Sequence, residues 1–276
     1  MPEADSLSDL NKIGHILCVA SGKGGVGKST TAVNLALALA CNAKVGVLDA
    51  DIYGPSIPTL LGVPAGTRPE VRGGKTMVPI RAHGLLCNSM GFLVDQSTAM
   101  VWRAPMIISA FNQILNDTAW SDLDYLIVDL PPGTGDIQLS LSQAVRVSGA
   151  VIVTTPQDLA LLDARRGIEM FRKVSVPVLG VVENMSVHIC SKCGHEEAIF
   201  GAGGGDRLAR DFEVPVLARP ALDPAIREAS DLGEPLLVKQ PGHPANAAWL
   251  ELASGVAERC AGATAQSAPK ITITDD

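Results

Sequence analysis

Apolar residues along this chain fall into short runs of strand length that alternate with longer stretches rich in helix-forming residues. Residues 16–20 (ILCVA) are a continuous apolar run, and residues 30–40 (TTAVNLALALA) favour a buried helix. Further strands are predicted at residues 44–48, 85–93, 124–129, 150–155 and 177–182, and further helices at 102–116, 158–172 and 244–261. Repeated strand–helix units predict an α/β fold: a doubly wound, mostly parallel sheet flanked by helices, with right-handed crossovers.

The composition is that of a globular protein with an ample core, since 47% of the 276 residues are hydrophobic and 18% are charged. The net charge of −7 argues against nucleic acid as a general partner, because phosphate contacts need clustered Lys and Arg. No apolar run approaches the ~20 residues that span a bilayer. Residues 1–14 resemble neither a secretory signal nor a transit peptide, so we expect a cytoplasmic protein.

The chain is expected to form a single domain over residues 13–261, preceded by an N-terminal segment at 1–12. Residues 62–84 are rich in Gly, Pro and Arg and are expected to be irregular or hairpin-like. From Gly262 onward the chain is rich in Ala, Ser and Thr, and residues 262–276 are predicted to be a disordered tail.

Residues 21–30 (SGKGGVGKST) carry the strongest chemical signal. Residues 22–29 match the phosphate-binding pattern G-x-x-x-x-G-K-[ST] at every fixed position, between a predicted strand and a predicted helix. Glycines let backbone N–H groups converge on an anion, and the helix N-terminus adds positive potential. Lys28 is expected on the β- and γ-phosphates and Ser29 on Mg²⁺. The predicted nucleotide-binding residues of this P-loop are Gly22, Lys23, Gly24, Gly25, Val26, Gly27, Lys28, Ser29 and Thr30.

A second lysine, Lys23, follows the first glycine of the loop, where an ordinary phosphate loop has no requirement. Taken alone, Lys23 would be interpreted as a solvated surface charge. In this spelling, GKGGVGKS resembles the deviant Walker A loop of the SIMIBI-like P-loop NTPases that include the nitrogenase iron protein, MinD and ParA. The resemblance implies ATP-dependent homodimer formation, with Lys23 of one subunit reaching the nucleotide of the other.

Aspartates close two of the predicted strands. Asp49 and Asp51 follow the second strand, and they lie beside the phosphate loop if that strand neighbours the first. Asp129 ends the strand 124–129 in the Walker B pattern, whose carboxylate holds Mg²⁺. The next residues, Leu130 to Asp136 (LPPGTGD), suit a switch II loop that senses the γ-phosphate, with Gly133, Gly135 and Asp136 as its predicted site residues.

The six cysteines divide into two groups. Four are interpreted as structural residues that behave as small hydrophobes: Cys18, Cys41, Cys87 and Cys260. The other two, Cys190 and Cys193, form a C-x-x-C motif that two thiolates of one metal site can share. It lies in an insertion near residues 187–195 of the predicted domain.

Four interpretations of the C-x-x-C motif compete. A thioredoxin-type redox pair would need a strand-to-helix junction of a different fold, and covalent haem fails because Gly194 stands where His is required. A zinc site could recruit His188 or His195, and the motif alone favours zinc. A [4Fe–4S] cluster usually takes four thiolates, which a symmetric dimer would supply from two chains. Combined with a dimerising ATPase loop, the motif favours the shared cluster.

Several segments together resemble the Mrp/ApbC family of iron–sulfur cluster carrier ATPases, bacterial type. They are GKGGVGKST, DADIYGPS, WRAPM, the loop from Asp129 to Asp136, ENMSVHICSKCG and residues 222–231. Ala104 departs from the family's W-R-G-P-M. The resemblance implies that Asp51 orients the attacking water, that Asp49 supports the Mg²⁺ shell and that Asn184 lies near the adenine under a loop at 219–224. Asn184 as a simple strand-end cap fits the sequence nearly as well.

The resemblance thus implies a homodimer with ATP, Mg²⁺ and a bridging [4Fe–4S] cluster held by Cys190 and Cys193. Slow hydrolysis would accompany delivery of the cluster from a donor to apoprotein clients. One alternative is a MinD/ParA-like positioning ATPase, for which the acidic tail supplies neither a basic face nor an amphipathic basic helix. We therefore expect no nucleic acid partner and no stable membrane association. A second alternative is a zinc-stapled nucleotide-binding dimer.

Overall fold

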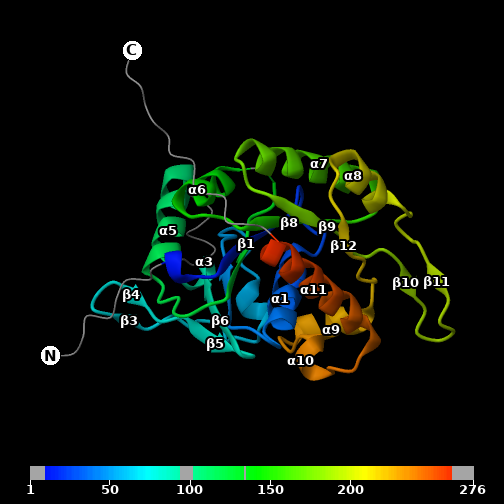
Figure 1. Ribbon diagram of the computed structural model, residues 1–276. Coiled ribbons are helices and arrows are strands. Elements are labelled where there is room, and N and C mark those ends of the chain that lie inside the picture. Colours follow the sequence, from blue (N-terminus) through cyan, green and yellow to red (C-terminus); the bar gives the residue numbers. More distant parts are fainter. Residues whose placement is uncertain (1–9, 94–101, 134, 263–276) are drawn as a thin grey trace, which may run out of the picture.

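A central sheet organises the structure, a computed structural model that describes residues 10–93, 102–133 and 135–262 (Figure 1). Within these residues eight strands form the sheet in the order β12-β9-β8-β1-β7-β2-β6-β5. All neighbours are parallel except β5 and β6. The strands are β1 His15–Ala20, β2 Val45–Asp49, β5 Ile80–Ala82, β6 Leu85–Ser89, β7 Tyr125–Asp129, β8 Gly149–Thr154, β9 Val178–Glu183 and β12 Val216–Ala218.

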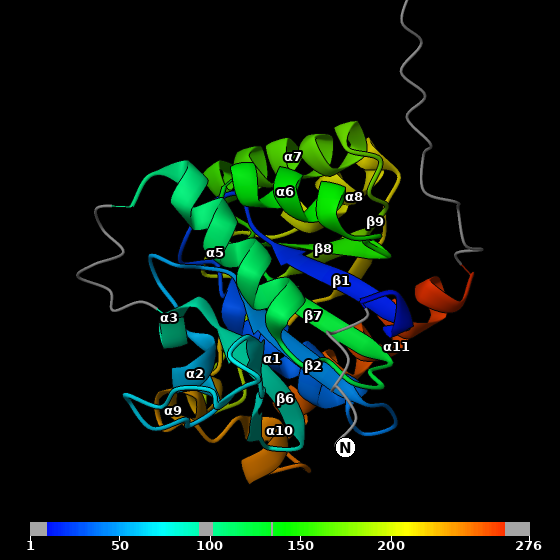
Figure 2. The same ribbon diagram turned by 90° about the vertical axis from the view of Figure 1, so that its left-hand side faces the viewer.

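Helices cover both faces of this sheet, which confirms the predicted doubly wound α/β architecture (Figure 2). One face is covered by α1 Lys28–Leu39 and α11 Ala247–Gly262, and the other by α5 Ala104–Asp117, α6 Asp136–Ala144, α7 Asp158–Lys173 and α8 Gly204–Phe212. Shorter helices are α2 Ile57–Leu60, α3 Met90–Leu93, α9 Pro224–Asp231 and α10 Leu236–Lys239, with 3₁₀ turns at Leu10–Lys12 and Pro244–Asn246. No helix in the described part of the chain is both long and apolar enough to cross a bilayer.

The continuous apolar runs of the sequence are a consequence of these two layers. Strand β2 is buried at each of its five positions, as expected of a parallel strand that packs helices on both faces. Helix α1 is buried on nearly all sides because it lies between the sheet and α11. Its alanine-rich sequence therefore lacks the polar stripe of a surface helix.

Two small hairpins stand outside the sheet. In the segment 62–84, β3 Val71–Arg72 pairs with β4 Thr76–Met77, as the hairpin prediction anticipated. After β9, β10 His188–Ile189 pairs with β11 Glu196–Glu197, and Figure 1 shows this hairpin projecting from the body of the molecule. The two hairpins add short antiparallel arms to a parallel scaffold.

Some boundaries differ from the sequence predictions. The strand predicted at 85–93 ends at Ser89, and α3 takes over at Met90. Gly262, where the tail was predicted to begin, is the last residue of α11, and the rest of the tail, 263–276, lies outside the described residues, as do 1–9 of the N-terminal segment. Cys41 was predicted to be a buried structural residue, but its side chain is exposed because it follows the end of α1.

Candidate functional site

The phosphate loop joins β1 to α1 at the carboxyl edge of the sheet. Gly25 (φ 81°) and Gly27 (φ 83°) are in the left-handed region that favours glycine, and Gly27 leads directly into α1 at Lys28. A Cβ on Gly24 or Gly25 would meet nothing within 4 Å, so the loop surface is open to a ligand. Backbone N–H groups at a helix N-terminus provide an anion site of the predicted kind.

Gly22 has a second role that the motif did not reveal. A Cβ at this position would lie 2.3 Å from the backbone oxygen of Asp163 in α7. The loop is therefore pressed against α7, and glycine is required there by packing as well as by phosphate binding.

Lys28 lies at the centre of the site. Its side chain is only 7% exposed, and Nζ lies 2.7 Å from Oδ1 of Asp129 and 3.3 Å from Oγ of Ser29. An ammonium group has three N–H donors, so one remains for a phosphate oxygen. The structure thus brings together the lysine, serine and Walker B aspartate that the sequence assigned to nucleotide and Mg²⁺.

Strand β7 lies between β1 and β2, so the second strand does not neighbour the first. The condition under which Asp49 and Asp51 were placed beside the loop is therefore not met directly. Asp129 nevertheless aligns with Asp49 on one side and with Val19 on the other. Two carboxylates on adjacent strands consequently meet at one buried point of the edge.

Asp49 is fully buried and acts as an anchor for the chain that follows it. Its Oδ2 accepts hydrogen bonds from the N–H of Ser56 (3.0 Å), the N–H of Ile57 (3.1 Å) and Oγ of Ser89 (3.0 Å). Burial, and secondly the nearby charge of Asp129, raise the pKa of the Asp49 carboxyl to about 7. Ser89, at the end of β6, was not singled out in the sequence because a lone serine after an apolar strand carries no motif.

One carboxylate oxygen of Asp129 accepts no hydrogen bond from the residues that the structure describes. Its Oδ2 is buried and has no hydrogen-bond partner within the described part of the chain. Burial raises the pKa of the Asp129 carboxyl, and the ammonium of Lys28 opposes that shift. A buried carboxylate oxygen without a donor fits a cation ligand, because Mg²⁺ prefers oxygen ligands of this kind.

Asp51 closes the turn after β2. It is 8% exposed, its N–H donates to Oδ1 of Asp49 (3.1 Å), and its Oδ1 accepts from the N–H of Gly54 (3.2 Å). Asp51 therefore belongs to the same carboxylate group as Asp49, with its side chain tied into its own turn. This placement is compatible with a group that orients a water next to the phosphates.

The loop after β7 contacts the phosphate loop directly. The N–H of Gly133 donates to the carbonyl of Ser21 over 2.9 Å. Gln138, buried in α6, accepts from the N–H of Gly135 and donates to the carbonyls of Pro131 and Gly133. Asp136, the third predicted switch residue, begins α6.

Gln138 was not singled out from the sequence, although its spacing carries a signal, since it is the third residue of α6 and forms the glutamine half of a capping box with Gly135. It holds the predicted switch loop from within, while Gly133 holds it against the phosphate loop. The predicted switch loop is therefore held directly beside the phosphate loop.

Lys23 lies half-buried at the loop and makes no ion pair with any residue that the structure describes. Its carbonyl accepts from Oγ of Ser21 over 2.8 Å. Asn184 follows β9, and its Nδ2 donates to the carbonyl of Val26 over 2.8 Å. Asn184 thus contacts the phosphate loop itself, which neither the adenine interpretation nor the capping interpretation included.

Cys190 and Cys193 lie at the tip of the β10–β11 hairpin, and almost every residue from Ile189 to Ile199 is exposed. The N–H of Cys190 donates to the carbonyl of His195 (2.9 Å), and the N–H of Gly194 donates to the carbonyl of Cys190 (2.8 Å). Gly194 has φ 70°, which closes the turn. Backbone hydrogen bonds therefore fix the conformation of the turn at residues 190–195, and both thiols lie at its surface.

The turn also activates one thiol. The backbone N–H groups of Lys192 and Cys193 donate to Sγ of Cys190 and lower the pKa of its thiol. No group of three or more His, Cys, Asp or Glu side chains gathers around a metal position in the described residues. Within those residues the two histidines considered for zinc do not join the thiols, and Nδ1 of His188 lies instead 3.2 Å from the carbonyl of Leu222.

The chain is similar to known proteins over most of its length. A sequence profile for the NUBPL iron-transfer P-loop NTPases matches residues 12–257. The chain belongs to this family. The matched residues of this chain include both the phosphate loop and the hairpin.

The similarity to curated relatives extends over most of this chain and over two thirds or more of each relative. An iron–sulfur cluster carrier protein of Pseudomonas fragi is 60% identical over 245 residues, which cover 88% of this chain and 85% of that one. An iron–sulfur cluster carrier protein of Escherichia coli K12 is 57% identical, with 90% of this chain and 67% of that one covered. The mouse iron–sulfur cluster transfer protein NUBPL is 54% identical, with 89% and 77% covered.

Solved structures give the same fold. A nucleotide-binding protein of Archaeoglobus fulgidus in complex with ADP has a TM-score of 0.74 and 37% identity, covering 88% of this chain and 93% of that one. The cell division ATPase MinD of Pyrococcus furiosus has a TM-score of 0.67 and 22% identity, covering 89% and 99%. The likeness to MinD is one of fold alone.

Proposed function

We propose that this NUBPL-family NTPase is an ATP-hydrolysing homodimer that carries a bridging [4Fe–4S] cluster and delivers it from a donor to apoproteins in the cytoplasm. The observation that carries the proposal is the pair of half-buried Cys190 and exposed Cys193 at the tip of a projecting hairpin of a P-loop NTPase. The iron–sulfur carriers of Pseudomonas fragi and Escherichia coli, named above, support the same assignment.

The thiol pair suits a transferable cargo. A lowered pKa increases the thiolate fraction of Cys190, and the thiolate is the form that binds iron. A [4Fe–4S] cluster takes four thiolates, so two chains related by a two-fold axis would each contribute Cys190 and Cys193. A cluster held at an exposed tip by two residues per chain is accessible to an incoming apoprotein.

The nucleotide edge supplies the ATPase half of the proposal. Lys28 and the loop N–H groups would bind the phosphates, and Ser29 with Asp129 would hold Mg²⁺, supported by Asp49. When bound, Mg²⁺ neutralises the charge that develops on the transferring phosphoryl group. Asp51 would orient the attacking water, and Gly133 and Gly135 would sense the γ-phosphate. Hydrolysis in this proposal is slow and coupled to cluster loading or transfer.

Exposed apolar side chains at the same edge support dimer formation there. Tyr53, just after β2, is 57% exposed, and Leu159 and Leu162, at the start of α7, are 71% and 48% exposed. Leu139 in α6 is 40% exposed. These residues lie in segments that follow β2, β7 and β8, at the carboxyl edge of the sheet that also carries the phosphate loop. A second copy facing the nucleotide would cover them and bring the partner's Lys23 to the phosphates.

Anaerobic reconstitution with iron and sulfide tests the proposal. The expected result is about four irons and four sulfides per dimer, with the visible absorption of an iron–sulfur cluster, and a dimeric mass by light scattering. One zinc per chain without sulfide would instead support the zinc-stapled dimer. Nucleotide-dependent pelleting with liposomes or DNA, without iron binding, would support a positioning ATPase.

A further inference from the structure

The segment after β9 contacts the phosphate loop at one end and carries the thiol pair at the other. Asn184 Nδ2 donates to the carbonyl of Val26, and Cys190 lies six positions further along the chain. Six residues span at most about 20 Å. We call residues 184–188 the strap, because they connect the two halves of the proposed function.

Asn184 is fixed closely to the loop. It is 6% exposed, and a Cβ on Gly27 would lie 2.2 Å from its Nδ2. Any rearrangement of Val26 or Gly27 when phosphates bind must therefore be shared by the Asn184 side chain. The strap therefore begins at a residue whose side chain contacts the phosphate loop directly.

Hydrogen bonds attach the middle of the strap to a second segment, residues 219–222. The N–H of Ser186 donates to the carbonyl of Pro220 (3.1 Å), and Ser186 Oγ lies 3.2 Å from the carbonyl of Arg219. The N–H of Leu222 donates to the carbonyl of Val187 (2.8 Å). Paired backbone of this kind moves as a unit.

His188 makes the last link before the hairpin. Its Nδ1 lies 3.2 Å from the carbonyl oxygen of Leu222, with which it also forms a parallel β-bridge. Because a carbonyl oxygen only accepts, Nδ1 carries the proton in this contact. His188 is the first residue of β10, so its position sets where the hairpin leaves the body of the protein.

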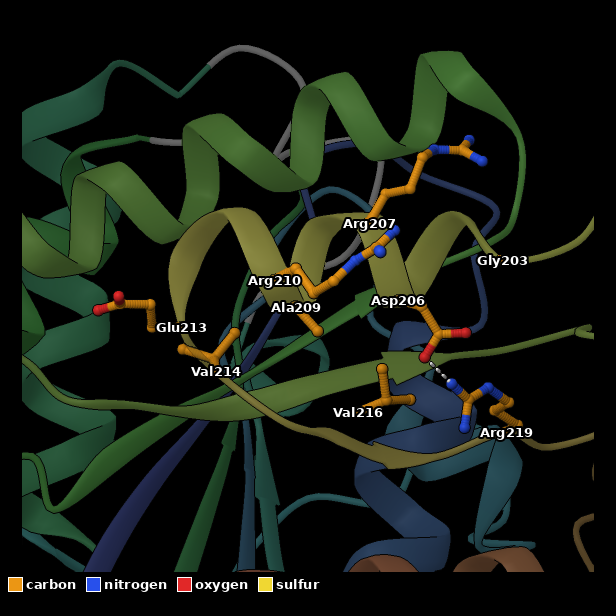
Figure 3. Close-up of a pocket in the computed structure, with 9 residues that line it drawn as sticks. All are labelled: Gly203, Asp206, Arg207, Ala209, Arg210, Glu213, Val214, Val216 and Arg219. Atoms are coloured by element: carbon orange, nitrogen blue, oxygen red, sulfur yellow. Dashed lines mark hydrogen bonds and ion pairs between the residues drawn. The ribbon is translucent and has the colours of Figure 1, made fainter.

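The second segment is anchored in turn. Glu183, 3% exposed at the end of β9, accepts from the N–H of Gly205 (2.7 Å) and pairs with Arg219 Nε (3.3 Å). Figure 3 shows Arg219 reaching Asp206 at the start of α8. Residues 219–222 thus form a fixed rail along which the strap lies.

Met185, between Asn184 and Ser186, has φ 56°. A non-glycine residue in the left-handed region is strained and persists only when its neighbours hold it there. The bonds of Asn184 to the loop and of Ser186 to the rail provide that restraint. The strained residue therefore lies between the two contacts that hold the strap.

We propose that the strap transmits the nucleotide state of the phosphate loop to the Cys190–Cys193 turn, with Ser186 and His188 as its positioning residues. The inference rests on the proposed function in that it takes the loop as a nucleotide site and the thiols as the cargo site. A ligand shifts a conformational equilibrium only through contacts that differ between the two states. Here the differing contacts are those of Asn184 with the loop and of the strap with the rail.

Alkylation of the thiols in metal-free, reduced protein tests the coupling without any cluster. Cys41 is first replaced in a Cys41→Ser background, because it is the other exposed cysteine of the described residues. The rate of iodoacetamide labelling at Cys190 and Cys193 is measured by peptide mass spectrometry with and without saturating MgATP or MgADP. The expected result is a several-fold change in rate on nucleotide binding.

Ser186→Ala combined with His188→Ala should bring the ratio of the two rates close to one, while nucleotide affinity by calorimetry stays within about twofold. The matched control is Ser191→Ala with His195→Ala, two exposed side chains of the same turn that should leave the ratio unchanged. His188→Asn, combined with the native Ser186, keeps an N–H donor at the position of Nδ1 and should retain the ratio.

A labelling rate that nucleotide does not alter, or an alteration that persists in the double alanine variant, would overturn the coupling. Should the double variant fail to fold, hydrogen exchange at the amides of Ser186 and Leu222 in the parent protein decides the question. Those amides should change in protection on nucleotide binding, and unchanged protection would also overturn the inference. Failure to bind nucleotide at all contradicts the proposed function itself, whereas failure to bind iron leaves this test intact.

Discussion

The ammonium of Lys28 lies 2.7 Å from Oδ1 of Asp129, in a buried contact between residues 101 positions apart in the chain. The contact joins the phosphate loop to the end of the central strand β7. It places one positive charge beside two buried carboxylates, Asp129 and Asp49. The balance among these three groups underlies the first two predictions.

Lys28→Ala should abolish ATP binding, because the phosphates lose the ammonium that faces them. It should also destabilise the fold by about 3 kcal/mol, since it leaves the carboxylate of Asp129 buried without its partner. Calorimetric titration and urea unfolding measure the two effects. Lys44→Ala, at the exposed and opposite end of β2, is the matched control and should alter neither. Nucleotide affinity close to wild type in Lys28→Ala would show that the loop assignment is wrong.

Asp49 should make the stability of the metal-free protein depend on pH. Its carboxyl has a pKa raised from 3.8 to about 7, so between these values the folded state binds more protons than the unfolded state. Stability should therefore fall as pH rises from about 4 to 7, by on the order of 1 kcal/mol per pH unit. Asp49→Asn should flatten this slope in urea titrations at several pH values. An identical slope in the variant would place the raised pKa elsewhere.

Lys23→Ala should keep ATP affinity but lose turnover. A cation that reaches the nucleotide of the partner subunit acts on the transition state, where such groups supply ~10³-fold or more in rate. Single-turnover hydrolysis and binding are measured on the same preparation. Equal losses of affinity and rate would place Lys23 in the site of its own subunit.

Asp51→Ala should trap an ATP-bound form that still binds Mg²⁺, because the attacking water loses its orienting group while Lys28, Ser29 and Asp129 are untouched. Retention of unhydrolysed ATP after gel filtration is the measurement. Unaltered turnover would assign the role to Asp136 or to another group.

Cys190→Ser and Cys193→Ser should each lose the cluster as completely as the double variant. Two-fold symmetry removes two of four ligands with either change, which leaves about zero of the expected two irons per chain. ATP binding should remain. Cys41→Ser, the exposed control, should keep its iron. Four irons per chain in a monomer would contradict the bridging geometry but keep the carrier function.

The layered fold and the parts of the site were predictable because each produces a pattern in a short stretch of consecutive residues. The P-loop is a contiguous motif, and the aspartates Asp49 and Asp129 follow apolar runs of strand length. Strand order was not predictable, since nothing in the residues of β7 states that it lies between β1 and β2. Strand order depends on how helices and strands distant in sequence pack together, and the residue pattern of one strand does not reveal this packing.

Three residues were missed or misplaced in the sequence for other reasons. Ser89 binds Asp49, which lies 40 positions away in the chain, so its neighbours in sequence carry no sign of that role. Gln138 binds the loop just before it as part of a capping box, a pattern that was not considered in the sequence. Cys41 was placed in the core because the preceding residues are apolar, although α1 ends at Leu39 and turns the chain outward. A boundary shift of one or two residues was enough to reverse its environment.

The hairpin of β10 and β11 has a consequence for how such proteins diversify. In the described residues it pairs with the rest of the protein only through the bridge from His188 to Leu222, and none of its strands belongs to the eight-stranded sheet. Slipping a strand of that sheet by one residue would turn every side chain to the opposite face. Lengthening or exchanging the hairpin tip shifts no such register, so the residues around the thiols can vary without disturbing the sheet that positions the phosphate loop.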